Sequence, residues 1–127
     1  MSRPKASPPA SSHRWRPRIK VWFEAEGGYS FGFGLIEILQ AVGCSGSIKG
    51  AADALGRSYR HVWDRIKEAE HALGCPLVST QVGGQGTHRS ELTDEARQLI
   101  ADFLAIRHRM IEVLETEFVP RRDPPAR

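Results

Sequence analysis

Two short amphipathic segments joined by a glycine constrain the fold more than any other feature of this chain. Apolar residues recur at the spacing of one helix face in both segments: Ile48, Ala51, Ala52 and Leu55, then Val62, Ile66, Ala69 and Leu73. Ser47 and Ser58 precede these segments, where a serine hydroxyl can cap a helix. Gly56 and Gly74 follow them, where a left-handed residue can end a helix. The sequence therefore predicts two helices separated by a tight turn.

The polar face of the second predicted helix indicates contact with DNA. In a helix-turn-helix, the first turn of the second helix lies against base edges. We expect Arg60 and Arg65 to donate to guanine edges or phosphate, and Ser47 and Lys49 to hold phosphate. The residues of the helix pair that we expect on DNA are Ser47, Lys49, Arg57, Ser58, Tyr59, Arg60, His61 and Arg65. An alanine-rich helix pair also occurs in helical proteins of every function, so the pair alone does not decide the function.

A β-hairpin is predicted directly after the helix pair. Two short β-prone runs, residues 77–81 and 88–93, flank a glycine-rich turn. Helix, turn, helix and hairpin together make a winged helix, whose wing can approach the DNA backbone or minor groove. The wing residues that we expect near DNA are Gly84, Gln85, Gly86, Thr87, His88 and Arg89. A plain surface hairpin would show the same pattern.

Taken together, the motifs G-S-I-x-x-A-A-x-x-L-G, S-Y-R-x-V-W-D, A-L-G-x-P-L-V, V-G-G-x-G and L-T resemble the N-terminal DNA-binding domain of the ModE family. These molybdate-responsive regulators share the wider LysR-type winged helix. The resemblance covers roughly residues 35–103, and Trp63, Asp64 and the glycines at 83–86 favour ModE over ordinary LysR proteins. It implies a sequence-specific regulator whose recognition helix begins near Ser58.

Two departures from the ModE pattern qualify what the resemblance implies. Family wings often carry a lysine within a longer glycine run, whereas Gln85, Thr87 and His88 interrupt the run here. Full-length members carry β-rich molybdate-binding domains, and no strand-rich segment follows Glu91 in this chain. We therefore expect a stand-alone DNA-binding domain with no cofactor, which can act through a separate sensor protein.

The expected fold class is mainly α (α+β), a winged helix-turn-helix with an N-terminal strand, a two-stranded wing and a long C-terminal dimerisation helix. Residues 18–118 form the domain, between a disordered basic arm at 1–17 and a disordered tail at 119–127. Apolar alternation predicts a strand over residues 18–26, pairing with the wing, and a turn at Gly27 and Gly28. A helix over 31–42 follows. We expect Trp22 to be partly buried, with a role in an interface as the alternative. We expect Trp63 to be a core residue that fixes the recognition helix, with contact to a base as the alternative.

The last predicted helix, over about residues 93–118, carries two apolar stripes. A domain of this size can cover one stripe, so we expect the other to pack against the same helix of a second copy. The residues expected in this dimer interface are Leu99, Phe103, Ile106, Met110, Val113 and Leu114. A two-fold dimer would present two recognition helices to half-sites roughly 34 to 36 Å apart, in a pseudo-palindrome. A long helix folded back over its own domain is the alternative.

Charge is segregated along the chain. Residues 1–20 hold six Lys or Arg and no acid, and residues 121–127 hold three Arg and one Asp, so residues 21–120 carry a net charge of −5 within a chain of formal net charge +3. Within that acidic part, residues 49–67 contain five basic residues against two Asp. The basic stretch coincides with the predicted recognition face.

Catalysis and membrane insertion find no support in the sequence. The five histidines are scattered, and we find neither a metal-ligand spacing nor a nucleophile motif. Cys44 and Cys75 are expected to be reduced, partly buried thiols, and no apolar run approaches a signal peptide or a membrane span. We expect a cytoplasmic, non-enzymatic protein. Two functions fit: a sequence-specific transcriptional regulator, and a winged helix used as a protein-interaction module without specific DNA reading.

Overall fold

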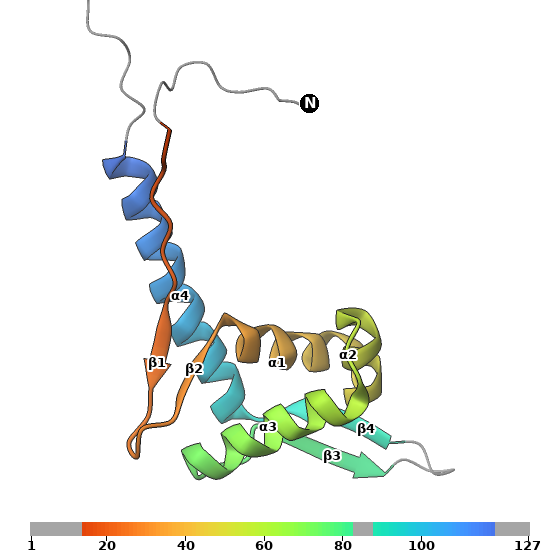
Figure 1. The fold of residues 1–127 in the computed structure, drawn as a ribbon. Helices are drawn as coiled ribbons and strands as arrows, with labels where there is room; N and C mark the ends of the chain where they lie inside the picture. Colours follow the sequence, from red (N-terminus) through yellow and green to blue (C-terminus); the bar gives the residue numbers. More distant parts are fainter. Residues whose placement is uncertain (1–13, 83–87, 119–127) are drawn as a thin grey trace, which may run out of the picture. The chain divides into compact units, whose positions relative to one another are not determined.

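A computed structural model describes residues 14–82 and 88–118, with the backbone alone at residues 82 and 88. The elements are β1 (Trp22–Glu24), β2 (Ser30–Gly32), α1 (Phe33–Ser45), α2 (Ile48–Leu55), α3 (Tyr59–Leu73), β3 (Val78–Val82), β4 (His88–Leu92) and α4 (Asp94–Glu117) (Figure 1). The described residues group into a larger unit, 20–107, and a smaller one made of residues 14–19 and 108–118. The predicted winged helix-turn-helix is confirmed, and it lies in the larger unit.

The helix pair forms as its sequence predicts. The Ser47 hydroxyl accepts the Gly50 N–H at 2.8 Å, and the Ser58 hydroxyl accepts the His61 N–H at 3.0 Å. Each serine thereby satisfies one of the free N–H groups in the first turn of its helix. Gly56, at φ 67°, ends α2 in the left-handed region, where a glycine has no Cβ to strain. These local signals fix the turn that leads into α3.

The N-terminal strand differs from the prediction in its length and its partner. Only Trp22–Glu24 is strand, and it pairs antiparallel with Ser30–Gly32, not with the wing. Gly27 and Gly28, at φ 90° and 94°, reverse the chain so that the segment directly after the turn becomes the partner. Closing such a short loop costs less chain entropy than pairing with a distant hairpin. Trp22 is 61% exposed, so the expectation of partly buried packing was wrong.

The core of the larger unit is built around α1. Five of its side chains are fully buried: Leu35, Ile36, Ile38, Leu39 and Val42. The helix starts at Phe33 and not at Phe31, because Phe31 belongs to β2. The ring centroid of Phe31 lies 5.6 Å from that of Phe23 in the paired strand β1. Residues of α2, α3, β3 and the first turns of α4 complete the core.

Phe103 of α4 corrects one part of the predicted dimer interface. Its ring centroid lies 5.0 Å from that of Phe23 and 6.3 Å from that of Phe31, and its side chain is fully buried. Phe103 is therefore a core residue of its own chain, and it is not free to face a second copy. Leu99 is partly buried against the same core. The β1–β2 hairpin covers part of a stripe that the sequence alone leaves uncovered.

The wing hairpin is attached to the helix pair at its base. β3 and β4 pair antiparallel from Val78↔Leu92 to Val82↔His88. The N–H of Ser90 donates to the carbonyl of Gly46 at 2.8 Å, at the junction of α1 and α2. The Thr93 hydroxyl donates to the Pro76 carbonyl at 2.8 Å and accepts the Ala96 N–H at 3.1 Å, which caps α4. The Ser90 hydrogen bond therefore joins β4 to the helix pair, and the Thr93 hydrogen bond joins the residues that flank the two strands.

The later part of α4 keeps apolar side chains exposed. Ile106 and Val113 are exposed, and Met110 and Leu114 are partly exposed. Residues 14–17 have no helix or strand and are exposed. The predictions of disorder for residues 1–13 and 119–127 lie outside the described residues.

Candidate nucleic-acid interface

The first turn of α3 presents a cluster of polar side chains to solvent. Tyr59 is 52% exposed, and Arg60, His61 and the preceding Arg57 are exposed as well. The apolar face of the helix is turned the other way, since Val62, Ile66 and Ala69 are fully buried. The structure therefore brings together four of the residues predicted to contact DNA. Ser58 lies among them, with its hydroxyl occupied as the helix cap.

The exposed cations of this cluster have weak partners. Arg60 Nη1 lies 3.6 Å from Asp64 Oδ1, one turn along the helix, and the Arg60 side chain is 76% exposed. An exposed pair of this kind is worth about 0.3 to 0.5 kcal/mol. Arg57 Nη1 lies 3.4 Å from His61 Nε2. Both arginines can therefore exchange their present partner for a ligand at small cost.

Arg65 has a different environment from Arg60. Its side chain is only 33% exposed, and its Nε lies 3.9 Å from Glu68 Oε1. Burial, and then the Glu68 carboxylate, raise the pKa of Tyr29 above its usual value, while the Arg65 charge opposes that rise. Arg65 is therefore less accessible than Arg60, and its charge acts on Tyr29. Its predicted contact with a base edge remains a prediction, and Arg60 is the better placed of the two.

A groove of about 620 Å³ lies beside this cluster, between α2, α3 and the wing hairpin. Its lining residues are Ser47, Ile48, Lys49, Tyr59, Trp63, Lys67, Thr80 and Ser90. Ser47, Lys49 and Tyr59 belong to the predicted set, and the structure shows that they share one concave surface. Lys49 Nζ lies 3.8 Å from Asp53 Oδ2, in a pair that is exposed on both sides.

Lys67, Thr80 and Ser90 were missed by the sequence reasoning. Helical spacing offers a signal for Lys67, which lies four residues after Trp63 and so on the same side of α3. Thr80 and Ser90 are paired across the wing strands, with their hydroxyl oxygens 3.4 Å apart. Only the register of the hairpin places them at the groove. Trp63 is partly buried against the core, in agreement with its predicted place, and it also lines the groove.

Glu70 joins α3 to the start of the wing. Its Oε2 accepts the N–H of Leu77 at 2.7 Å and the N–H of Val78 at 3.1 Å. Its Oε1 accepts from Lys67 Nζ at 3.2 Å. The carboxylate therefore sets the position of β3 relative to the recognition helix. Sequence reasoning missed it, because its partners are backbone groups beyond the end of the helix.

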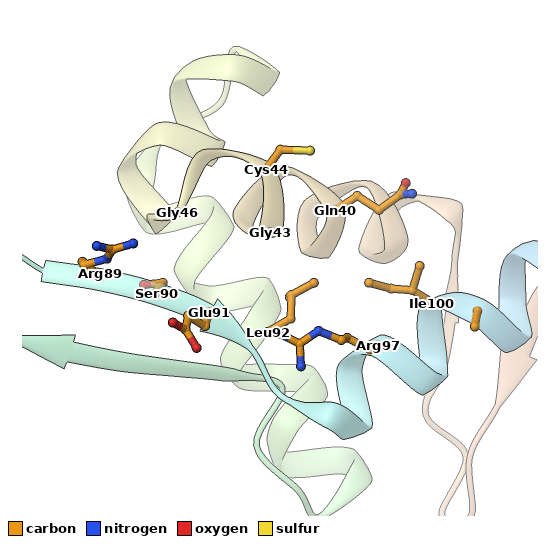
Figure 2. Close-up of a pocket in the computed structure, with 11 residues that line it drawn as sticks. Gln40, Gly43, Cys44, Gly46, Arg89, Ser90, Glu91, Leu92, Arg97 and Ile100 are labelled. Carbon is orange, nitrogen blue, oxygen red and sulfur yellow. The ribbon is translucent and has the colours of Figure 1, made fainter.

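The predicted wing contacts are only partly described. Gly84, Gln85, Gly86 and Thr87 lie outside the described residues, and His88 is described only as the first backbone position of β4. Arg89 is exposed. Its side chain lines a second hollow of about 530 Å³, between α1, β4 and the start of α4 (Figure 2). Leu92 and Ile100 point into this hollow, and Arg97 lies at its edge and pairs with Asp94 at 3.1 Å.

Other kinds of site find little support in residues 14–82 and 88–118. No group of three or more His, Cys, Asp or Glu in these segments is arranged to hold a metal ion. Both cysteines are free thiols, and Cys75 is partly buried as expected. The expected partial burial of Cys44 was wrong, because its side chain is exposed. No helix among the described residues is long and apolar enough to cross a membrane.

Comparisons with known proteins agree with this geometry. Residues 33–97 match the sequence model of the bacterial regulatory helix-turn-helix proteins of the lysR family, from the start of α1 to the first turn of α4. The molybdenum-pterin-binding protein MopB of Rhodobacter capsulatus is 32% identical over 89 residues, which are 70% of this chain and 33% of MopB. The molybdenum transport protein ModE of Herbaspirillum seropedicae is 31% identical over 80 residues, 63% of this chain and 30% of that protein. The chain thus spans about a third of the length of these relatives.

Solved structures share the fold at lower identity. The BenM DBD in complex with benA site 1 DNA has a TM-score of 0.51 and 20% identity, over 68% of this chain and 94% of that one. The CbnR DBD–DNA complex has a TM-score of 0.52 and 21% identity, with the same coverage of both chains. At these identities the likeness concerns the fold.

Proposed function

This chain belongs to the lysR family of bacterial regulatory helix-turn-helix proteins, and we propose that it regulates transcription by binding double-stranded DNA in a sequence-specific way. The observation that carries the proposal is the exposed cluster at the start of α3, where Tyr59, Arg60 and His61 stand on a helix whose opposite face is buried. In helix-turn-helix proteins this part of the second helix enters the major groove.

Arg60 is the proposed base-reading residue. Its guanidinium has an exposed ion pair with Asp64 and a contact with the Trp63 ring, and it can donate two hydrogen bonds to O6 and N7 of a guanine. Tyr59, His61 and Arg57 flank it and are proposed to contact bases or backbone. Ser47 and Lys49, on the first turn of α2, are proposed to hold a phosphate. Arg89 is proposed to contact DNA from the wing, together with His88 and the tip residues.

A homodimer is proposed through α4. Ile106 and Val113 are exposed and seven residues apart, so they lie on one face of this helix. Met110 and Leu114 lie between or beside them and are partly exposed. Packing this face against its copy would remove apolar surface from water and place two recognition helices on one side of the DNA. The proposed operator is therefore a pseudo-palindrome.

A link to molybdenum metabolism is proposed from the relatives. MopB and ModE are named for molybdenum-pterin binding and molybdenum transport, and the match covers about a third of each. We propose that this domain controls genes for the uptake or use of molybdenum. Its proposed location is the cytoplasm, where the DNA is.

Selection of genomic DNA fragments by the purified protein tests the function. The full chain is incubated with sheared DNA of the source organism at physiological salt, competed with bulk DNA, and the retained fragments are sequenced. Enrichment of a few promoter fragments that share an inverted repeat is expected, with genes of molybdenum transport or use beside them. Uniform retention would refute specific reading, and no retention would favour the protein-interaction module.

A further inference from the structure

Trp63 lies between two cations on the same side of α3. The guanidinium carbon of Arg60 is 5.6 Å from the centre of the Trp63 ring system, and Lys67 Nζ is 5.4 Å from it. Both distances fall within the roughly 6 Å over which a cation is attracted to an indole face. Because the ring is packed against the core, it offers the two flexible side chains a fixed surface.

Lys67 and Arg60 belong to two different parts of the surface. Lys67 and Trp63 both line the groove between α2, α3 and the wing hairpin, whereas Arg60 does not belong to its lining. Arg60 stands at the first turn of α3, in the exposed cluster proposed to read bases. The side chain of Lys67 is 47% exposed, so its ammonium group can be reached from solvent. The indole of Trp63 therefore contacts Lys67, which lines the groove, and Arg60, which belongs to the exposed cluster beside the groove.

The groove has the chemistry of a phosphate-backbone site. Lys67 and Lys49 supply positive charge, and the exposed Thr80 supplies a hydroxyl group from the wing hairpin. Ser90 is 5% exposed, and its hydroxyl oxygen lies 3.4 Å from that of Thr80. Arginine and lysine side chains, hydroxyl groups and backbone N–H groups all donate to phosphate oxygens in protein–DNA complexes. A lysine suits this role as a compact point charge, while the planar fork of an arginine suits a guanine edge.

Lys67 can leave its present partner without creating an unsatisfied carboxylate. Its ammonium lies 3.2 Å from Glu70 Oε1, yet Glu70 keeps two backbone N–H donors on Oε2. The exchange of Glu70 for a phosphate therefore costs one partly exposed ion pair. Glu70 meanwhile holds the start of β3 in place.

We propose that the groove binds the sugar-phosphate backbone of one DNA strand, and that Trp63 is a positioning residue that directs Lys67 to a phosphate there and Arg60 to the adjacent base edges. The inference rests on the proposed function and deepens it. It adds Lys67 to the backbone contacts, and it couples a backbone contact to base reading through one aromatic ring.

The test measures the affinity of the full chain for a selected and a scrambled fragment at several salt concentrations. Lys67→Gln is expected to lower the slope of log K against log salt by about 1, as for the loss of one phosphate contact. The ratio between the two fragments should stay unchanged. Lys20→Gln is the matched control, since Lys20 is exposed and does not line the groove. An unchanged slope for Lys67→Gln would overturn the inference.

The Trp63 variants test the positioning role. Trp63→Leu is expected to lower both the salt slope and the fragment ratio, with a loss of about two- to fivefold in affinity for each cation contact removed. Trp63→Phe keeps an aromatic face and should rescue part of both. Thermal unfolding of each variant checks the fold. If the folded Phe and Leu variants have the same slope and ratio as the wild type, the positioning role is wrong.

A fluorescence readout does not depend on the variants' affinity. The chain has three tryptophans, so Trp15→Phe with Trp22→Phe leaves Trp63 as the only one. Saturating DNA should change its emission if backbone lies in the groove, and unchanged emission would contradict that placement.

If the wild type binds no DNA at any salt, the proposed function fails and this inference with it. If it binds a selected fragment and the Lys67→Gln slope is that of the wild type, only this inference fails.

Discussion

Replacing Glu70 with alanine should be the most disruptive single change at the junction of the recognition helix and the wing. Its carboxylate accepts the N–H groups of Leu77 and Val78 at 2.7 and 3.1 Å, and its side chain is 12% exposed. Leu77 and Val78 are themselves buried. A buried donor that loses its acceptor costs about 1 to 3 kcal/mol. Because water can reach part of this site, we expect Glu70→Ala to lower the free energy of unfolding by about 2 to 4 kcal/mol.

Two further variants separate the loss of the two hydrogen bonds from the loss of the negative charge. Glu70→Gln keeps an oxygen for the two amides but removes the charge and the ion pair with Lys67, so its expected cost is about 1 kcal/mol. Glu68→Ala removes an exposed carboxylate on the same helix, and its effect should stay within about 0.5 kcal/mol. Urea unfolding followed by circular dichroism gives these values.

Hydrogen exchange locates the effect of the Glu70 change. In Glu70→Ala the amides of Leu77 and Val78 should exchange faster, relative to global unfolding, than in the wild type. The reasoning would be refuted if Glu70→Ala were no more destabilising than Glu68→Ala, or if these two amides kept their protection.

Three other changes have defined outcomes. Tyr29→Phe should raise the free energy of unfolding by about 1 kcal/mol, because the buried Tyr29 hydroxyl has no hydrogen-bond partner among the described residues. The fold raises the pKa of Tyr29 above its usual value of 10.0, so the contribution of this residue to the free energy of unfolding is fully present below pH 10.0 and is lost as the pH rises through the folded pKa. Thermal unfolding at pH 8 and above pH 10 should therefore show a smaller loss of stability at alkaline pH in Tyr29→Phe than in the wild type. Ser58→Ala should cost about 1 kcal/mol in urea unfolding through the lost cap of α3, and an effect near zero would contradict the cap. Ile106→Glu with Val113→Glu should shift the protein towards the monomer in sedimentation analysis, whereas an unchanged mass would refute the proposed α4 interface.

Much of the helix pair could be predicted because its signals are local. Ser47 and Ser58 act on N–H groups three residues away, and Gly56 ends α2 through its own backbone conformation. The start of α4 after Thr93 is equally local, since the Thr93 hydroxyl caps the Ala96 N–H. Such contacts need no knowledge of the rest of the fold.

What the sequence did not reveal depends on long-range packing. Phe103 has the spacing of an interface residue, but only the position of the β1–β2 hairpin shows that Phe23 and Phe31 cover it. The same spacing leaves Ile106 exposed. An apolar stripe therefore shows that a surface needs a partner, and does not show which partner covers each residue.

In the candidate interface, too, some residues could be predicted from local spacing and others depend on long-range packing. The cluster at the start of α3 follows from helical spacing, whereas the groove wall formed by Thr80 and Ser90 depends on the register of β3 and β4. Arg65 shows the limit of spacing arguments. Its spacing places it on the polar side of α3, yet in the structure its side chain is only 33% exposed.

The specificity of Arg60→Ala tests the central claim most directly. Binding of the wild type and the variant to a selected fragment and to its scrambled version is measured at one fixed salt concentration. A lost bidentate contact to guanine should reduce the discrimination between the two fragments by about 1 to 3 kcal/mol, while the variant keeps its fold and its weaker nonspecific binding. If Arg60→Ala discriminates between the fragments as well as the wild type does, the start of α3 is not the surface that reads the DNA.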